Sequence, residues 1–184
     1  MHHKKNLALF ILLAAAFIPF NFGGCSGRKD PGVSRNKASL DKHSIHIINK
    51  DSLSNILTDN KGKVIFINVW ATWCEPCVKE FPDIVKIYNE YKNKNISFLS
   101  LSVDLKSDID SVVIPFLKKQ SAGLPVYLVD EKSSEAVINY LNPEWSGAIP
   151  VTIIYDKKGR REKFLSGAQD YLQLKNSIDS VESL

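Results

Sequence analysis

The feature that most constrains the fold is an apolar run that ends just before a pair of cysteines. Residues 63–70 (KVIFINVW) are nearly all apolar, as in a strand buried on both faces of a parallel sheet. A helix is predicted over 74–92, because apolar residues recur there at helical spacing. The chain therefore places a C-x-x-C motif where a central strand gives way to the N-terminus of a helix.

This position changes the chemistry of the first cysteine. A helix N-terminus presents unpaired N–H groups and the positive end of the helix dipole, which lower the pKa of a thiol placed there. Cys74 is therefore the predicted nucleophile, and Cys77 is placed to attack a mixed disulfide on Cys74. Pro76 fits the first turn, where its missing N–H costs no hydrogen bond. The pair predicts a redox-active disulfide that works without a further cofactor.

Outside the motif, β-type runs and helical stretches alternate along the chain. Strands are predicted over 44–48, 63–70, 95–103, 124–129, 150–155 and 160–165, and helices over 50–59, 74–92, 108–120, 133–141 and 170–181. Helices between strands indicate a mostly parallel sheet, and the short turn DKKG makes the last two strands an antiparallel pair. We expect a three-layer α/β/α domain.

The N-terminal part has a different character. A basic start precedes twelve apolar residues, 7–18, which fall short of the roughly 20 that a spanning helix needs and favour a secretion signal. The sequence FGGC resembles the lipobox of bacterial lipoproteins, although Phe22 stands where Leu is usual. The resemblance implies that Cys25 is lipidated and anchors the protein. The alternatives are a buried core helix and a free or disulfide-forming Cys25.

The charges follow the same division. The whole chain has 24 Lys and Arg against 20 Asp and Glu, a formal charge of +4. Six of these basic residues but only one acidic residue precede position 39, so residues 39–184 carry −1. No basic surface remains to bind nucleic acid. We expect a signal peptide at 1–24, a lipidated N-terminus with a flexible tether at 25–38, and a catalytic domain at 39–184.

The stretch WATWCEPC resembles the active site of the thioredoxin superfamily, most closely the membrane-associated thiol-disulfide oxidoreductases of the TlpA/ResA type. Pro82 falls where such proteins kink the active-site helix, and Ile149-Pro150 matches their cis-proline beside the disulfide. The extra strand and helix within 95–141 match an insertion of this branch. The resemblance implies a thioredoxin-like fold with a mixed central sheet and an inserted strand-helix unit.

Glu75, Pro76 and Glu80 are expected to tune the cysteines. Asn68 stands where thioredoxins have a buried aspartate, so proton transfer at Cys77 needs another group. Glu80 matches an acidic residue near the cysteines of the ResA-like branch; a role in proton handling and a solvated helix-face glutamate are both open. The negative charge of Glu75 disfavours a thiolate on Cys74, but the same charge stabilises the helix N-terminus. Because no His lies between the cysteines, a reducing site is favoured over an oxidising one.

Substrate binding is expected to combine an aromatic platform with backbone pairing. Trp73 beside Cys74 supplies an exposed apolar surface, and Ile149 and Pro150 contact the substrate backbone. Trp145 either borders this groove or anchors a loop. The expected partners are disulfide-containing exported proteins, apocytochrome c among them, and a membrane electron donor that re-reduces the pair. The expected location is the extracytoplasmic or periplasmic side of a bacterial membrane.

Other roles of the cysteine pair stay open. One is a structural disulfide, and another is a zinc site built from Cys74, Cys77, His43 and His46. A peroxidase of the peroxiredoxin type would need a Pro-x3-Thr-x2-Cys motif, and residues 68–71 supply no proline. An oxidising disulfide-forming enzyme and a non-catalytic binding module are the remaining alternatives.

Overall fold

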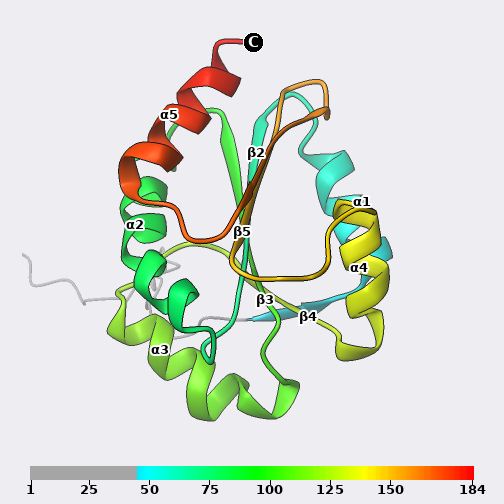
Figure 1. The fold of residues 1–184 in the computed structure, drawn as a ribbon, viewed down its shortest axis with the longest axis vertical. Coiled ribbons are helices and arrows are strands. Elements are labelled where there is room, and N and C mark those ends of the chain that lie inside the picture. Colours follow the sequence, from blue (N-terminus) through cyan, green and yellow to red (C-terminus); the bar gives the residue numbers. More distant parts are fainter. Residues whose placement is uncertain (1–44) are drawn as a thin grey trace, which may run out of the picture. The chain divides into compact units, whose positions relative to one another are not determined.

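The computed structural model describes residues 45–184. The predicted signal peptide, Cys25, the tether and His43 lie outside this range. The strands are β1 (His46–Ile48), β2 (Val64–Trp70), β3 (Ile96–Ser102), β4 (Val126–Val129), β5 (Val151–Tyr155) and β6 (Arg161–Ser166). The helices are α1 (Lys50–Asp59), α2 (Glu75–Tyr91), α3 (Ile114–Lys119), α4 (Ser134–Leu141) and α5 (Tyr171–Glu182) (Figure 1). Each predicted strand and helix has a counterpart.

The strands form one sheet in the order β1-β4-β3-β2-β5-β6. The first four in this order are parallel, and β5 and β6 are antiparallel to their neighbours. Strand β5 thus departs from the expectation that helix-joined strands run parallel. The first residue of β5, Val151, pairs with Val69 near the C-terminal end of β2, so β5 starts at the edge of the sheet where β2 ends and runs back along it.

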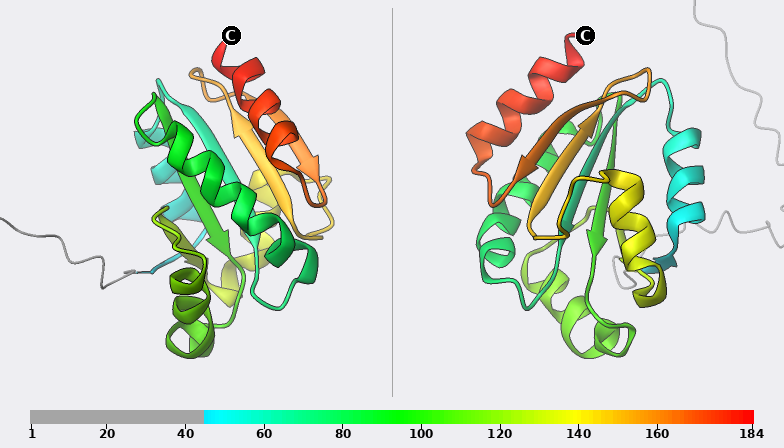
Figure 2. Two further views of the ribbon diagram at one scale, coloured as in Figure 1. Left: turned by 90° about the vertical axis from the view of Figure 1, so that its left-hand side faces the viewer. Right: turned by 45° about the vertical axis from the view of Figure 1, so that its right-hand side comes forward.

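Helices cover both faces of the sheet. Helices α2, α3 and α5 pack on one face through residues such as Ile84, Leu117 and Leu174. Helices α1 and α4 cover the other face through Leu53 and Val137 (Figure 2). The three-layer α/β/α architecture is confirmed.

An aromatic cluster supports the end of β2 that leads to the cysteines. Trp70 is fully buried, with ring centroids 4.5 Å from Phe81 and 5.2 Å from Phe116. Its indole N–H donates to Ser100 Oγ on β3 at 2.7 Å. Aromatic pairs at these separations add to the stability that burial supplies, so the strand end below the cysteines is firmly held.

The helix predicted over 108–120 is continuous only in its last part. A 3-10 turn (Lys106–Asp108) and a π-helical turn (Ile109–Val113) precede α3. Pro115 explains the break, because it has no N–H to complete an α-helical ladder through this segment.

No helix within residues 45–184 is both long and apolar enough to cross a membrane.

Candidate active site

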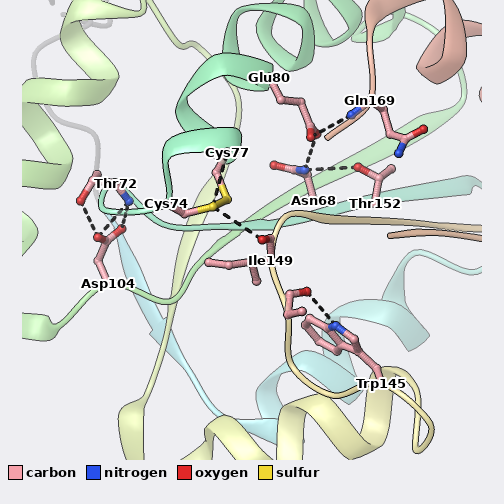
Figure 3. Close-up of a disulfide and its surroundings, with 11 residues drawn as sticks. Asn68, Thr72, Cys74, Cys77, Glu80, Asp104, Trp145, Ile149, Thr152 and Gln169 are labelled. Carbon is pink, nitrogen blue, oxygen red and sulfur yellow. Dashed lines mark hydrogen bonds between the residues drawn. A yellow bond between two sulfur atoms is a disulfide. The ribbon is translucent and has the colours of Figure 1, made fainter. Parts of the chain in front are cut away.

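Cys74 and Cys77 form a disulfide at the junction of β2 and α2 (Figure 3). Cys74 is the N-cap of α2, in extended conformation, and the backbone N–H of Cys77 points at Cys74 Sγ from 3.3 Å. Cys74 is 5% exposed and Cys77 2%. After reduction, this N–H and the helix dipole favour a thiolate at Cys74, the more exposed of the two residues.

The first turn of α2 contains Glu75 and Pro76. Glu75 is exposed and pairs with Lys79 at 2.8 Å, one turn along the helix. The hydrogen bond from Lys79 and its charge lower the pKa of Glu75. Lys79 therefore offsets part of the negative charge that Glu75 brings near Cys74. The sequence contains this i, i+4 pair, but reasoning about Glu75 alone overlooked it.

Glu80 is buried, 4% exposed, so its interpretation as a solvated helix-face residue is wrong. Its Oε1 accepts a hydrogen bond from Asn68 Nδ2 at 3.0 Å, and its Oε2 accepts one from the Gln169 backbone N–H at 3.1 Å. Asn68 Nδ2 also donates to Thr152 Oγ1 at 3.2 Å. Residues from α2, β2, β5 and the loop before α5 thus meet around this carboxylate (Figure 3).

Burial raises the pKa of Glu80 to about 7, and the hydrogen bonds from Gln169 and Asn68 offset only part of that effect. Both donors are neutral amides, and no Lys or Arg forms an ion pair with Glu80 within the described residues. A carboxyl group with this pKa exchanges its proton near neutral pH. Glu80, three residues after Cys77 on the same helix, can therefore act as an acid or a base.

The Ile149-Pro150 bond is cis, as the resemblance implied. The carbonyl oxygen of Ile149 lies 3.7 Å from Cys74 Sγ. The N–H of Ile149 donates to no partner within residues 45–184. An extended chain can therefore pair with this backbone directly beside the disulfide.

The two tryptophans near the site differ in exposure. Trp73 is 67% exposed, which makes it available as the predicted platform. Trp145 is 8% exposed, and its indole N–H donates to the Ala148 carbonyl at 2.9 Å. Trp145 therefore anchors the loop that leads to Ile149, the second of the two roles considered for it.

A third carboxylate near the site escaped the sequence analysis. Asp104 follows β3 and is 1% exposed. It accepts hydrogen bonds from the Thr72 backbone N–H at 3.0 Å, from Thr72 Oγ1 at 2.5 Å and from Ser102 Oγ at 2.7 Å. Asp104 thereby fixes the loop between β2 and Cys74. The one signal in the sequence was an acidic residue directly after a buried strand.

The zinc alternative required four residues to meet. His46 lies exposed on β1, and β4 and β3 separate it from β2 in the sheet. His43 lies outside the described residues. Within residues 45–184, no three His, Cys, Asp or Glu side chains are grouped to hold a metal ion.

Comparison with known proteins gives a consistent result. The model of the AhpC/TSA family matches residues 41–161. Thiol-disulfide oxidoreductase ResA of Bacillus thuringiensis subsp. konkukian is 32% identical over 127 residues, 68% of this chain and 67% of that protein. Thioredoxin-like protein YneN of Bacillus subtilis is 25% identical over 177 residues, 96% of this chain and 98% of that protein.

A solved structure agrees with these relatives. A DsbF homologue from Corynebacterium diphtheriae superposes with a TM-score of 0.58 at 26% identity. The superposition covers 67% of this chain and 75% of that one.

Proposed function

The chain belongs to the AhpC/TSA family and is a thiol-disulfide oxidoreductase, and from this premise we propose that it reduces disulfides in exported proteins. One observation carries the proposal. Cys74 Sγ lies between the N-terminus of α2, which favours its thiolate, and the free backbone edge of Ile149, which can hold a polypeptide. A nucleophilic sulfur and a site for extended chain thus lie side by side.

The proposed reaction transfers two electrons from the reduced cysteine pair to a substrate disulfide. The Cys74 thiolate attacks one substrate sulfur, which forms a mixed disulfide and releases the other substrate sulfur as a thiolate. Cys77 then loses its proton and attacks Cys74 Sγ. The Cys74–Cys77 disulfide forms, and the substrate leaves as a dithiol after it takes up two protons.

Glu80 is the proposed proton carrier for Cys77. Its pKa of about 7 lets it accept the Cys77 proton when Cys77 attacks and pass that proton to the departing substrate thiolate. Asn68, in the place of the aspartate of thioredoxins, supports this role because it donates a hydrogen bond to Glu80 rather than competing for the proton. No other cofactor is needed in this scheme.

The proposed direction is reduction. Glu75 brings negative charge next to Cys74, and only Glu75 and Pro76 separate the cysteines, so no His⁺ stabilises the thiolate there. A less stable thiolate makes the dithiol a better electron donor. A dithiol donor in the membrane would regenerate the reduced pair.

The proposed location is the outer side of a bacterial membrane. Lipidated Cys25 would anchor the chain, and residues 26–38 would be a tether about 20 Å long for the domain. Intact-mass measurement on protein extracted from membranes checks this, since an unmodified Cys25 contradicts the anchor.

Trapping the partner tests the function. In a Cys77→Ser variant the mixed disulfide on Cys74 cannot be resolved, so exported proteins should accumulate on Cys74 and separate on reduction. Cys74→Ser is the matched control and should capture none. If Cys74→Ser retains biological activity, the protein acts as a binding module instead. A reduction potential as high as those of strong periplasmic oxidants, near −120 mV, would contradict the reducing direction.

A further inference from the structure

Three turns rich in lysine lie at one end of the sheet. They are residues 60–63 before β2, 92–95 before β3 and 156–160 between β5 and β6. Strands β2 and β3 pair in parallel from their first residues, and Ile65 near the start of β2 pairs with Tyr155 at the end of β5. The three turns, called the basic turns below, therefore lie at the same end, where α5 also ends (Figure 2).

Hydrogen bonds hold the basic turns side by side. The Gly62 N–H donates to the Lys157 carbonyl at 2.9 Å, and Asn95 Nδ2 donates to the Gly62 carbonyl at 2.9 Å. Lys157 Nζ donates to the Glu182 carbonyl of α5 at 3.0 Å. The basic turns thus form one surface, and the fold sets its shape.

This surface has a large excess of positive charge. The basic turns contain seven Lys and Arg against one Asp, a formal charge of +6. The acidic residue, Asp156, is buried and pairs with Arg160 at 2.7 Å. Asp59, Glu162 and Glu182 adjoin the turns and leave the excess positive. The six lysines are all exposed: Lys61, Lys63, Lys92, Lys94, Lys157 and Lys158.

The charges of these six lysines are not paired. Within residues 45–184, none of the six forms an ion pair with a carboxylate. Lys63 and Lys92 donate to the neutral side chains of Asn60 and Asn89. The surface is therefore free to attract an anionic partner.

The rest of the domain carries the opposite charge. Residues 45–184 carry −1 in total, so the part outside the basic turns carries −7. The disulfide follows the other end of β2, whose seven residues span about 23 Å. An anionic surface attracts the basic turns and repels the remainder. The small net charge thus conceals a domain that turns one particular end toward such a surface.

We propose that the basic turns dock on the anionic headgroups of the membrane that anchors the protein. This inference rests on the proposed membrane location, which keeps the domain close to a lipid surface. Each lysine near an anionic bilayer strengthens binding about fivefold, so the turns together favour docking. The docked domain holds Cys74 at the end away from the bilayer, where exported proteins can reach it.

Lysine acetylation tests the proposal on the full-length protein, purified from membranes and reconstituted into vesicles. One set of vesicles contains phosphatidylcholine alone, and the other contains about one third phosphatidylglycerol. A membrane-impermeant reagent acetylates exposed lysines, and mass spectrometry gives the rate at each. On the anionic vesicles we expect rates about fivefold lower at the basic turns and unchanged at Lys118 and Lys119 of α3. About 1 M NaCl, which shortens the Debye length to about 3 Å, should remove the difference.

A pair of double variants locates the effect. Lys61→Glu with Lys158→Glu reverses two charges whose side chains donate no hydrogen bond within residues 45–184, and protection of Lys63 and Lys157 should fall below about twofold. Lys118→Glu with Lys119→Glu is the matched control: it makes the same change in net charge on exposed residues of α3 and should leave the protection intact.

The outcomes separate this inference from the proposed function. Equal acetylation on the two kinds of vesicle, equal protection of Lys118 and Lys119, or protection that survives in the Lys61→Glu, Lys158→Glu variant overturns the docking. Reduction of a disulfide peptide by the same protein in solution is measured alongside. Docking without reduction overturns the function alone, and reduction without docking overturns the inference alone. The wild-type comparison decides even if a variant fails to fold.

Discussion

Two buried carboxylates lie near the disulfide, and their surroundings differ. Glu80, 4% exposed, is bonded by neutral amides from β2 and from the loop before α5. Asp104, 1% exposed, accepts from the backbone and hydroxyl of Thr72 and from Ser102. Two carboxylates that are both almost fully buried thus have different roles. Glu80 joins distant segments and can take up a proton, whereas Asp104 ties down the loop that leads to Cys74.

The difference teaches that two buried carboxylates can take different roles according to the segments that their hydrogen bonds join. Each oxygen of Glu80 accepts one hydrogen bond from a neutral amide, and these do not offset the cost of burying the charge, so its pKa rises. Asp104 accepts from two hydroxyls and a backbone N–H, and its contacts lie at positions 72 and 102, on the two strand ends that frame the site.

The largest effect we predict concerns Glu80→Gln and the pH dependence of stability. Folding raises the pKa of Glu80 from 4.5 to about 7, so the folded protein holds this proton more tightly than the unfolded chain. The resulting stability is fully present below pH 4.5 and is lost as the pH rises through 7, by roughly 3 kcal/mol. Glutamine keeps the neutral form, so the variant should not show this loss.

Urea unfolding of the oxidised protein at pH 5 and pH 8 checks this prediction. The free energy of unfolding should fall between these two conditions in the wild type and change much less in Glu80→Gln. If the free energy of unfolding falls equally in the wild type and in Glu80→Gln, Glu80 is not the titrating group. The distinction drawn between Glu80 as a proton carrier and Asp104 as a loop anchor would then fail.

The second prediction concerns Asp104→Ala. The substitution leaves three donors, two on half-buried Thr72 and one on buried Ser102, without their acceptor, which costs about 2 kcal/mol. The loop before Cys74 loses its attachment to β3, so the rate at which iodoacetamide alkylates reduced Cys74 should change severalfold. Asp104→Asn retains a carbonyl acceptor for the Thr72 N–H and should recover part of both effects.

Asp156→Ala is the control for this experiment. Asp156 is also buried but holds the turn between β5 and β6 through Arg160 and the Lys158 backbone N–H. Its loss should lower the stability and leave the alkylation rate of Cys74 unchanged. If Asp104→Ala and Asp156→Ala change the alkylation rate of Cys74 alike, the change in Asp104→Ala results from a general loss of stability and not from the loop before Cys74.

The sequence predicted the local features of the site but not the long-range contacts of Glu80 and Asp104. Periodicity and turn residues predicted every β-strand and α-helix of residues 45–184 but not the 3-10 and π-helical turns before α3, and α1 has the predicted bounds. The C-x-x-C position predicted that Cys74 lies at the N-terminus of the helix, where the structure places it as the N-cap. These features depend on neighbours in the chain. Asp104 meets Thr72 across 32 residues and Glu80 meets Gln169 across 89, and local patterns carry no information on such pairs.

The smallest predicted effect comes from one isosteric substitution, Thr to Val, made once beside Asp104 and once beside Glu80. Thr72→Val removes one hydroxyl donor from Asp104 but keeps the backbone N–H. Thr152→Val removes one hydroxyl acceptor from Asn68, the residue that bonds Glu80. Each change should cost about 1 kcal/mol in unfolding free energy, the usual worth of one buried hydrogen bond.

The two variants should differ in what else they change. Thr72→Val acts on the loop before Cys74 and should alter the alkylation rate of Cys74 more than Thr152→Val does. Thr152→Val changes the hydrogen bonds around Glu80. It should shift the pH at which the stability due to Glu80 is lost, because Asn68 Nδ2 no longer divides its hydrogen bonds between Thr152 and Glu80. If Thr72→Val shifts this pH by the same amount, the two carboxylates work as one network. Their division into a proton carrier and a loop anchor is then wrong.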